Sequence, residues 1–189
     1  MKSVFRLPTA LAAAALICAV HVAGASSATA APAATVEEIP LSFAYYDPAI
    51  AEENGFRIVQ DAEGMQRSEP VTEEAKALVA KQSRHTVIGK CGSATLNMAR
   101  VGGTRQVFVS TGYRVPLPTV YHTWTVDLTR GSQAWAVGLN GGPTTGSWSA
   151  SRTVTTNNNQ GVRGIVRAGS HAFLTNGAVC FAGAPNSGT

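Results

Sequence analysis

The sequence predicts an all-β fold: an antiparallel β-sandwich or barrel of roughly seven to nine short strands, preceded by an acidic segment with one short helix. Three observations support this prediction. After residue 84 the chain alternates apolar and polar residues with a period of two, turn residues recur at short intervals, and no helical patterns separate the alternating segments. Strands with one apolar and one polar face are typical of antiparallel sheets.

The chain begins with the pattern of a secretory signal peptide, which we expect to span residues 1–30. Lys2 and Arg6 form a short positive region, an alanine-rich apolar stretch follows, and residues 28–30 (Ala-Thr-Ala) match the small-x-small cleavage pattern. Alanine is only weakly apolar and His21 interrupts the stretch, so a permanent membrane anchor is not expected, nor is a membrane contact after cleavage. The alanine-rich signal resembles those of high-GC Gram-positive bacteria.

Residues 31–83 form an acidic N-terminal segment. Turn residues at Asp47-Pro48 and Asn54-Gly55 bound short apolar runs. A helix is predicted over residues 72–82, because Thr72 can cap it and two glutamates follow in its first turn.

Residues 84–189 form the predicted β domain. In its clearest alternating segment, one face carries apolar residues together with His122, and the other carries Tyr121, threonines and Asp127. Asn176-Gly177 is a strong hairpin signal. The expected strands lie within residues 94–99, 107–110, 120–129, 134–139, 147–155, 162–168, 172–175 and 178–182.

Charge divides the chain into two regions of opposite sign. Residues 35–75 hold ten acidic and two basic residues, a net charge of −8, whereas residues 76–189 hold one acidic and eleven basic residues, a net charge of +10. Such an asymmetry indicates a charged partner or an interacting tail. We therefore expect an intramolecular contact in which residues 37–74 cover and mask the basic domain.

Two cysteines remain after signal cleavage, Cys91 and Cys180. In an oxidising compartment a pair of cysteines predicts a disulfide, which would connect the start of the β domain to its end.

Catalytic patterns are missing from the β domain. Its single acid, Asp127, lies on the strand face opposite His122, so a serine triad is not expected, and glycoside hydrolysis needs two facing carboxylates. His85, His122 and His171 lack the spacing of a metal clip, so we predict no metal and no cofactor. His122 is interpreted as a core histidine, although a functional role for any of the three stays open.

Aromatic residues divide between the core and the surface. Trp124, Trp135 and Trp148 are in phase with apolar neighbours and are predicted to be buried. Tyr113 and Tyr121 are the expected surface aromatics.

Arginines are the candidate ligand contacts. Arg163 and Arg167 share parity along one expected strand and should therefore point the same way. The other candidates are Arg100, Arg105, Arg114 and Tyr121. Because the chain is exported and shows no nucleic-acid module, an anionic cell-wall polymer or an acidic protein is the expected partner, and nucleic acid is not.

The sequence thus favours a secreted, non-catalytic binding module and leans against an enzyme. A small secreted hydrolase, with a site assembled from distant strands around His122 or His171, is one alternative. A secreted inhibitor or toxin-like protein, masked by its acidic N-terminal segment, is another.

Overall fold

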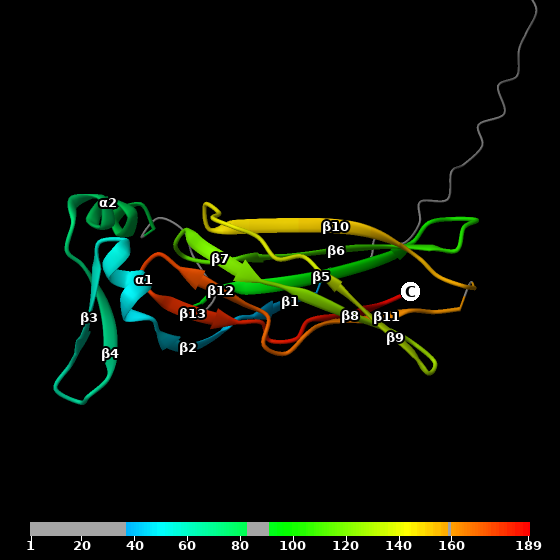
Figure 1. Cartoon of the computed structure of the whole chain (residues 1–189), viewed down its shortest axis with the longest axis horizontal. Coiled ribbons are helices and arrows are strands. Elements are labelled where there is room, and N and C mark those ends of the chain that lie inside the picture. Colours follow the sequence, from blue (N-terminus) through cyan, green and yellow to red (C-terminus); the bar gives the residue numbers. More distant parts are fainter. Residues whose placement is uncertain (1–36, 83–90, 159) are drawn as a thin grey trace, which may run out of the picture. The chain divides into compact units, whose positions relative to one another are not determined.

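The computed structural model describes residues 37–82, 91–158 and 160–189. The expected signal peptide at residues 1–30 and His85 lie outside these ranges. The described residues belong to one compact unit and are mostly β, with every strand pair antiparallel, which confirms the predicted class (Figure 1).

The described part of the chain holds fourteen strands and two helices. The helices are α1 (Pro48–Glu53) and α2 (Glu73–Gln82). The strands are β1 (Glu37–Pro40), β2 (Ser42–Tyr46), β3 (Phe56–Gln60), β4 (Gln66–Pro70), β5 (Ser93–Arg100), β6 (Gln106–Arg114), β7 (Thr119–Thr123), β8 (Thr125–Arg130), β9 (Gln133–Gly138), β10 (Ser147–Thr155), β11 (Arg163–Val166), β12 (His171–Leu174), β13 (Ala178–Phe181) and β14 (Asn186–Gly188).

The strands form four sheets, with the orders β1-β5-β6-β10, β14-β11-β8-β9, β2-β13-β12-β7 and β3-β4. The structure therefore has more strands and more sheets than the expected seven to nine strands of one sandwich or barrel. One reason is that the acidic segment supplies four strands, β1 to β4, where the sequence showed only short apolar runs between turns.

A second reason is that one alternating segment makes two strands. Residues 120–129 keep one buried face throughout, but hydrogen bonding changes at Trp124, between β7 and β8. There the Trp124 amide donates to Asn140 Oδ1 at 2.8 Å and the Trp124 carbonyl accepts from the Leu139 amide at 2.8 Å. The side-chain period continues across this point, so the sequence carries no sign of the change of sheet.

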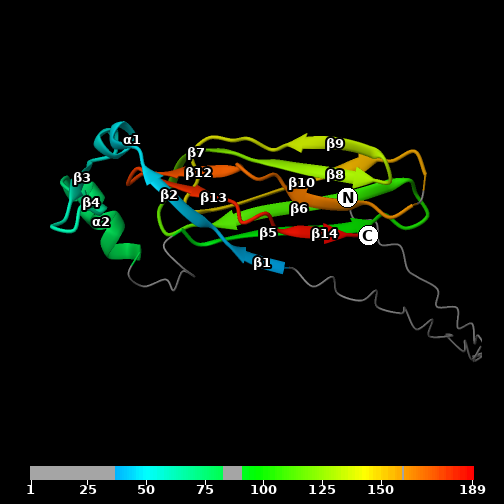
Figure 2. The same cartoon turned by 90° about the horizontal axis from the view of Figure 1, so that it is seen from below.

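Two sheets pack face to face across the core. At Gly164 in β11, an added Cβ would lie 2.3 Å from Met98 Sδ in β5 and 3.1 Å from Leu128 Cδ2 in β8. The absence of a side chain at Gly164 therefore allows β11 to approach β5 closely. In Figure 2, β8 and β9 lie along one side of the molecule and β5 and β6 along the other.

Trp124 occupies the centre of this core, fully buried, and its Nε1 donates to Thr111 Oγ1 at 3.0 Å. Tyr113 is also buried, which corrects its expected surface position. Tyr113 pairs with Ala94 and Trp148 on the inner face of its sheet. The inward alternation of β6 extends to residue 113, beyond the segment we assigned to the strand.

The two helices begin at side-chain caps. Thr72 Oγ1 accepts a hydrogen bond from the Ala75 amide at 3.2 Å, which confirms the predicted start of α2. Helix α1 was not expected, because Asp47-Pro48 looked like a turn. Instead Asp47 Oδ1 accepts from the amides of Ala49 and Ile50, at 3.0 and 3.2 Å, and the proline takes the first helical position.

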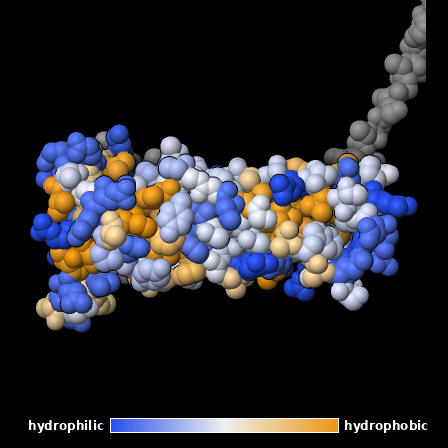
Figure 3. Space-filling model, viewed as in Figure 1, coloured by the Kyte–Doolittle hydropathy of each residue, from blue (hydrophilic) through white to orange (hydrophobic). Residues whose placement is uncertain are grey.

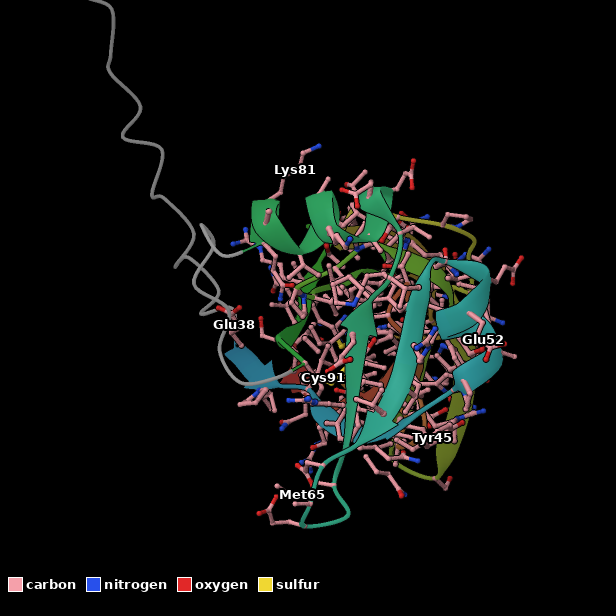
Figure 4. The ribbon with its side chains drawn as sticks, turned by 90° about the vertical axis from the view of Figure 1, so that its left-hand side faces the viewer. Glu38, Tyr45, Glu52, Met65, Lys81 and Cys91 are labelled. Carbon is pink, nitrogen blue, oxygen red and sulfur yellow. A yellow bond between two sulfur atoms is a disulfide. The ribbon has the colours of Figure 1, made fainter. Side chains whose placement is uncertain are left out.

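The predicted disulfide is present. It connects Cys91, before β5, to Cys180 in β13, and both residues are fully buried (Figure 4). The bond therefore joins two of the sheets covalently. Neither helix within the described ranges has the length and apolar character that a membrane span requires.

The acidic segment contacts the basic domain through backbone pairing. Strand β1 pairs with β5, and β2 pairs with β13. Within the described residues, no ion pair joins residues 37–74 to residues 91–189. Charge attraction is thus not what connects the two parts in the structure.

Candidate functional site

Two adjoining hollows form a groove along the outer face of β1, β5, β6 and β10 and continue to the end of α2. Their volumes are about 470 and 680 Å³, and both are lined by Glu38, Ser93, Arg114 and Ser147. Lys81 from α2 lines the larger hollow. We call this the Arg114 groove. Volumes of this size are in the range of ordinary ligand sites.

Strand register places the polar side chains of the groove in rows. Ser93, Arg114 and Ser147 lie directly opposite one another across β5, β6 and β10. Directly opposed residues in an antiparallel sheet point to the same face, so their side chains gather on the outer surface. Thr95, Gly112 and Ser149 form the neighbouring row.

Glu38 adds a carboxylate to the groove, opposite Thr95 in the β1–β5 pairing. The Ser93 hydroxyl donates a hydrogen bond to Glu38 Oε1. Figure 4 labels Glu38 on β1 and Lys81 on α2, and both residues line the larger hollow. Arg114 and Lys81 are exposed, and neither forms an ion pair with any residue that the structure describes.

The floor of the groove lacks a side chain at Gly112. A Cβ at this position would lie 2.4 Å from the backbone oxygen of Trp148 in β10. Glycine therefore permits the local backbone approach and leaves hydroxyl groups around an open surface.

The predicted ligand contacts Arg163 and Arg167 lie on the outer face of β11 and just after it. Arg167 binds Asp127 in β8 through two nitrogens, with Nη2 at 2.6 Å from Oδ1 and Nε at 3.0 Å from Oδ2. The hydrogen bonds that Arg167 donates to Asp127, together with the negative charge of Asp127, raise the pKa of Arg167. Much of the Arg167 charge is thus already balanced, whereas the guanidinium of Arg163 has no acidic partner within the described chain.

The remaining candidates lie elsewhere. Arg100 donates from Nη2 to the Gln160 carbonyl, and Arg105 follows in the β5–β6 connection. Tyr121 in β7 is 39% exposed and its ring stacks on Phe173 at 4.2 Å. Burial raises the pKa of Tyr121, with smaller contributions from nearby acidic groups. The six candidates therefore do not form one site, and only Arg114 lines the groove.

His122 is a satisfied core residue, as interpreted from its sequence context. Its Nδ1 lies 3.0 Å from the Tyr113 hydroxyl and its Nε2 lies 3.3 Å from the Leu139 carbonyl. Burial lowers the pKa of His122, and the bond to Leu139 partly opposes this. Its two ring nitrogens are occupied, and no carboxylate approaches it among the described residues.

His171 begins β12, and its ring contacts Phe173 and Phe181 at centroid distances of 5.0 and 5.3 Å. Its Nδ1 lies 2.6 Å from the Gly169 carbonyl. In the part of the chain that the structure describes, no three His, Cys, Asp or Glu side chains gather closely enough to hold a metal ion.

Sequence reasoning missed Glu38, Lys81 and Ser93 as groove residues. They come from β1, α2 and β5, and no local pattern connects these three segments. Ser147 and Ser149 did give a signal, since they belong to the polar face of an alternating strand. The alternation alone does not indicate which other segments of the chain would lie beside that face.

Comparison of the chain with protein families, with curated proteins and with solved structures finds no match.

Proposed function

We propose that this protein is a secreted, non-catalytic module that binds an anionic, hydroxyl-rich extracellular polymer in the Arg114 groove. The observation that supports this most directly is the placement of two exposed cations without ion-pair partners, Lys81 and Arg114, beside rows of serine and threonine hydroxyls. Guanidinium and ammonium groups bind carboxylate or phosphate, and hydroxyls both donate to and accept from sugar hydroxyls.

The groove is poorly equipped for hydrolysis. Glu38 is the one carboxylate among its described lining residues, while glycoside hydrolysis uses two carboxylates on opposite sides of the bond. Activation of Ser93 as a nucleophile would need an oriented base such as histidine. Binding therefore fits these residues better than catalysis.

The proposal also covers the export of the chain and the arrangement of its sheets. We infer that residues 1–30 direct secretion, since a buried disulfide suits an oxidising compartment. We also infer that β14-β11-β8-β9 and β2-β13-β12-β7 act as one interrupted layer of a β-sandwich, because β7 leads into β8 and β11 leads toward β12.

The surface character agrees with a polar ligand. The face in Figure 3 carries scattered hydrophobic patches among hydrophilic residues instead of one continuous apolar area. Large apolar patches are typical of stable protein–protein contacts. The face in Figure 3 shows no large apolar area of that kind.

Masking by the acidic segment is proposed to act through Glu38. An anion entering the groove meets the Glu38 carboxylate next to the Arg114 row. Removal of this charge should therefore strengthen binding. Glu38→Gln tests the idea more cleanly than deletion of residues 31–75, because β1 and β2 are paired into the sheets.

The test is sedimentation of the mature protein with purified cell wall at low and high salt. Arg114→Gln should lower affinity about tenfold at low salt, the loss of one charged hydrogen bond, and Glu38→Gln should raise it. Arg152→Gln, an exposed arginine of β10 that does not line the groove, is the matched charge control. If the two arginine variants lose affinity equally, the binding depends only on the net charge of the protein. If Arg114→Gln loses no affinity, the proposal is refuted.

A further inference from the structure

Arg130, the last residue of β8, is a buried cation without a counter-charge. It continues the inward alternation of Val126 and Leu128 and is 6% exposed, which makes it the one buried Lys, Arg, Asp or Glu in the described chain. Its Nη2 donates to Gln133 Oε1. Its Nη1 is buried and has no hydrogen-bond acceptor.

A second orphaned donor lies beside it. The guanidinium carbon of Arg130 is 5.9 Å from the ring centroid of Trp135 in β9, and Trp135 Nε1 is also buried without an acceptor. Two unsatisfied donors on residues that line the same hollow are unusual because each carries a desolvation cost. Their common need is an oxygen-bearing, negatively charged acceptor.

The basic domain has no acidic side chain left to supply one. Asp127 is the single acidic residue of residues 76–189, and it is bound to Arg167 at 2.6 Å. None of the ion pairs formed by the described residues includes Arg130. A buried guanidinium without a counter-charge is destabilising in general, so an anion from outside would stabilise the folded protein.

The surroundings of Arg130 provide room and further donors. It lines two hollows of about 510 and 490 Å³, the first shared with Arg163 and the second with Trp135, Ser132 and Asn157. The Gln133 side chain, which accepts the hydrogen bond from Nη2, is exposed. An exposed glutamine can turn outward at little cost, and this would free Nη2.

We propose that Arg130 is the centre of an oxyanion site that binds phosphate, with the Gln133 amide oxygen standing where a phosphate oxygen binds. A phosphate would accept hydrogen bonds from Arg130 Nη1 and Nη2 and from Trp135 Nε1, and the planar fork of arginine suits such an anion. The site involves β8, β9 and the C-terminal end of β10, whereas the Arg114 groove involves β1, β5, β6, α2 and the N-terminal end of β10, and the two share no lining residue. It therefore stands independently of the proposed polymer groove.

Thermal unfolding of the mature protein in inorganic phosphate tests this site, with sodium chloride at matched ionic strength as the reference. At a phosphate concentration about a hundredfold above its Kd, the Tm of the wild type should rise by about 5–10 °C. Arg130→Met should show no such rise. Without phosphate, Arg130→Met should be as stable as the wild type or more stable, because it removes an uncompensated charge.

Gln133→Glu is a second variant that keeps Arg130. It places a carboxylate on the guanidinium within the chain, so the Tm should be raised before any phosphate is added and should respond little to it afterwards. This variant decides the matter if Arg130→Met does not fold. Phosphate also stabilises proteins in general by exclusion from their surface, and that effect would be equal in all three proteins.

The proposal is overturned if phosphate up to about 10 mM leaves the wild-type Tm unchanged, since weaker binding would not act at ordinary concentrations. It is equally overturned if the wild type, Arg130→Met and Gln133→Glu rise together. A second titration, with soluble poly(glycerol phosphate), tests whether the site binds a phosphodiester polymer or free phosphate. An Arg130-dependent rise at a lower phosphate-group concentration than for inorganic phosphate identifies a phosphodiester polymer, and a rise with inorganic phosphate alone identifies a free anion.

Discussion

Removal of the disulfide should destabilise the protein by an amount that follows from its position in the chain. Cys91 and Cys180 are separated by 89 residues, and both are fully buried. On the chain-entropy model, a closed loop of this length lowers the entropy of the unfolded chain enough to stabilise the native state by about 4.6 kcal/mol at 25 °C. Because domains of this size are stable by about 5–15 kcal/mol, the double variant Cys91→Ala/Cys180→Ala should lose a third or more of its stability.

Urea unfolding of the mature protein measures this loss. The midpoint should move to lower urea in the double variant, and the m-value should increase because the unfolded chain is no longer cross-linked and exposes more surface. Wild-type protein unfolded under reducing conditions is the control, and it should match the double variant. Alanine is used because serine would place a new hydroxyl in a fully buried position.

A loss below about 1 kcal/mol, with the m-value unchanged, would refute this reasoning. It would mean that the two segments stay close together in the unfolded protein, or that strain in the native bond offsets the entropy term. A double variant much less stable than the reduced wild type would instead point to packing of the sulfur atoms as the main contribution.

Three further predictions concern packing, protonation and capping. Gly164→Ala should lower stability by about 1–3 kcal/mol through overpacking against Met98, seen as a lower Tm. Because Met98→Ala is destabilising by itself, the double variant Gly164→Ala/Met98→Ala should lose less than the sum of the two single losses. The pKa of His122 is lowered in the folded state, so its contribution to folding stability is fully present above about pH 6.5 and is lost as the pH falls from there through the folded-state pKa. In urea unfolding between pH 8 and 4, the stability of His122→Gln should therefore depend less on pH than that of the wild type. Parallel plots of stability against pH for the two proteins would contradict this reasoning. Asp47→Ala should cost about 0.5–2 kcal/mol by removing the cap of α1, and Asp47→Ser should restore most of it in the same unfolding assay.

The antiparallel β class, helix α2 and the inward face of β8 were predictable because their signals are local. Side chains alternate with a period of two along any strand, so the burial of Trp124 and Val126 can be inferred without knowledge of the neighbouring strands. The cap at Thr72 likewise involves residues three positions apart. Helix α1 was missed for a related reason, since Asp47-Pro48 is a local signal that turns and helix starts share.

The Arg114 groove and the unpaired state of Arg130 were decided by tertiary structure alone. Ser93 meets Glu38 across 55 positions of sequence, and Arg167 meets Asp127 across 40. Backbone hydrogen bonds pair any two strands with nearly equal strength, so strand order and register follow from the packing of whole faces and not from the residues that end up opposite one another. The sequence by itself therefore determined the inward face of the clearest alternating segment and that two cysteines would pair. Only the fold decided which charges of the described residues found partners and which did not.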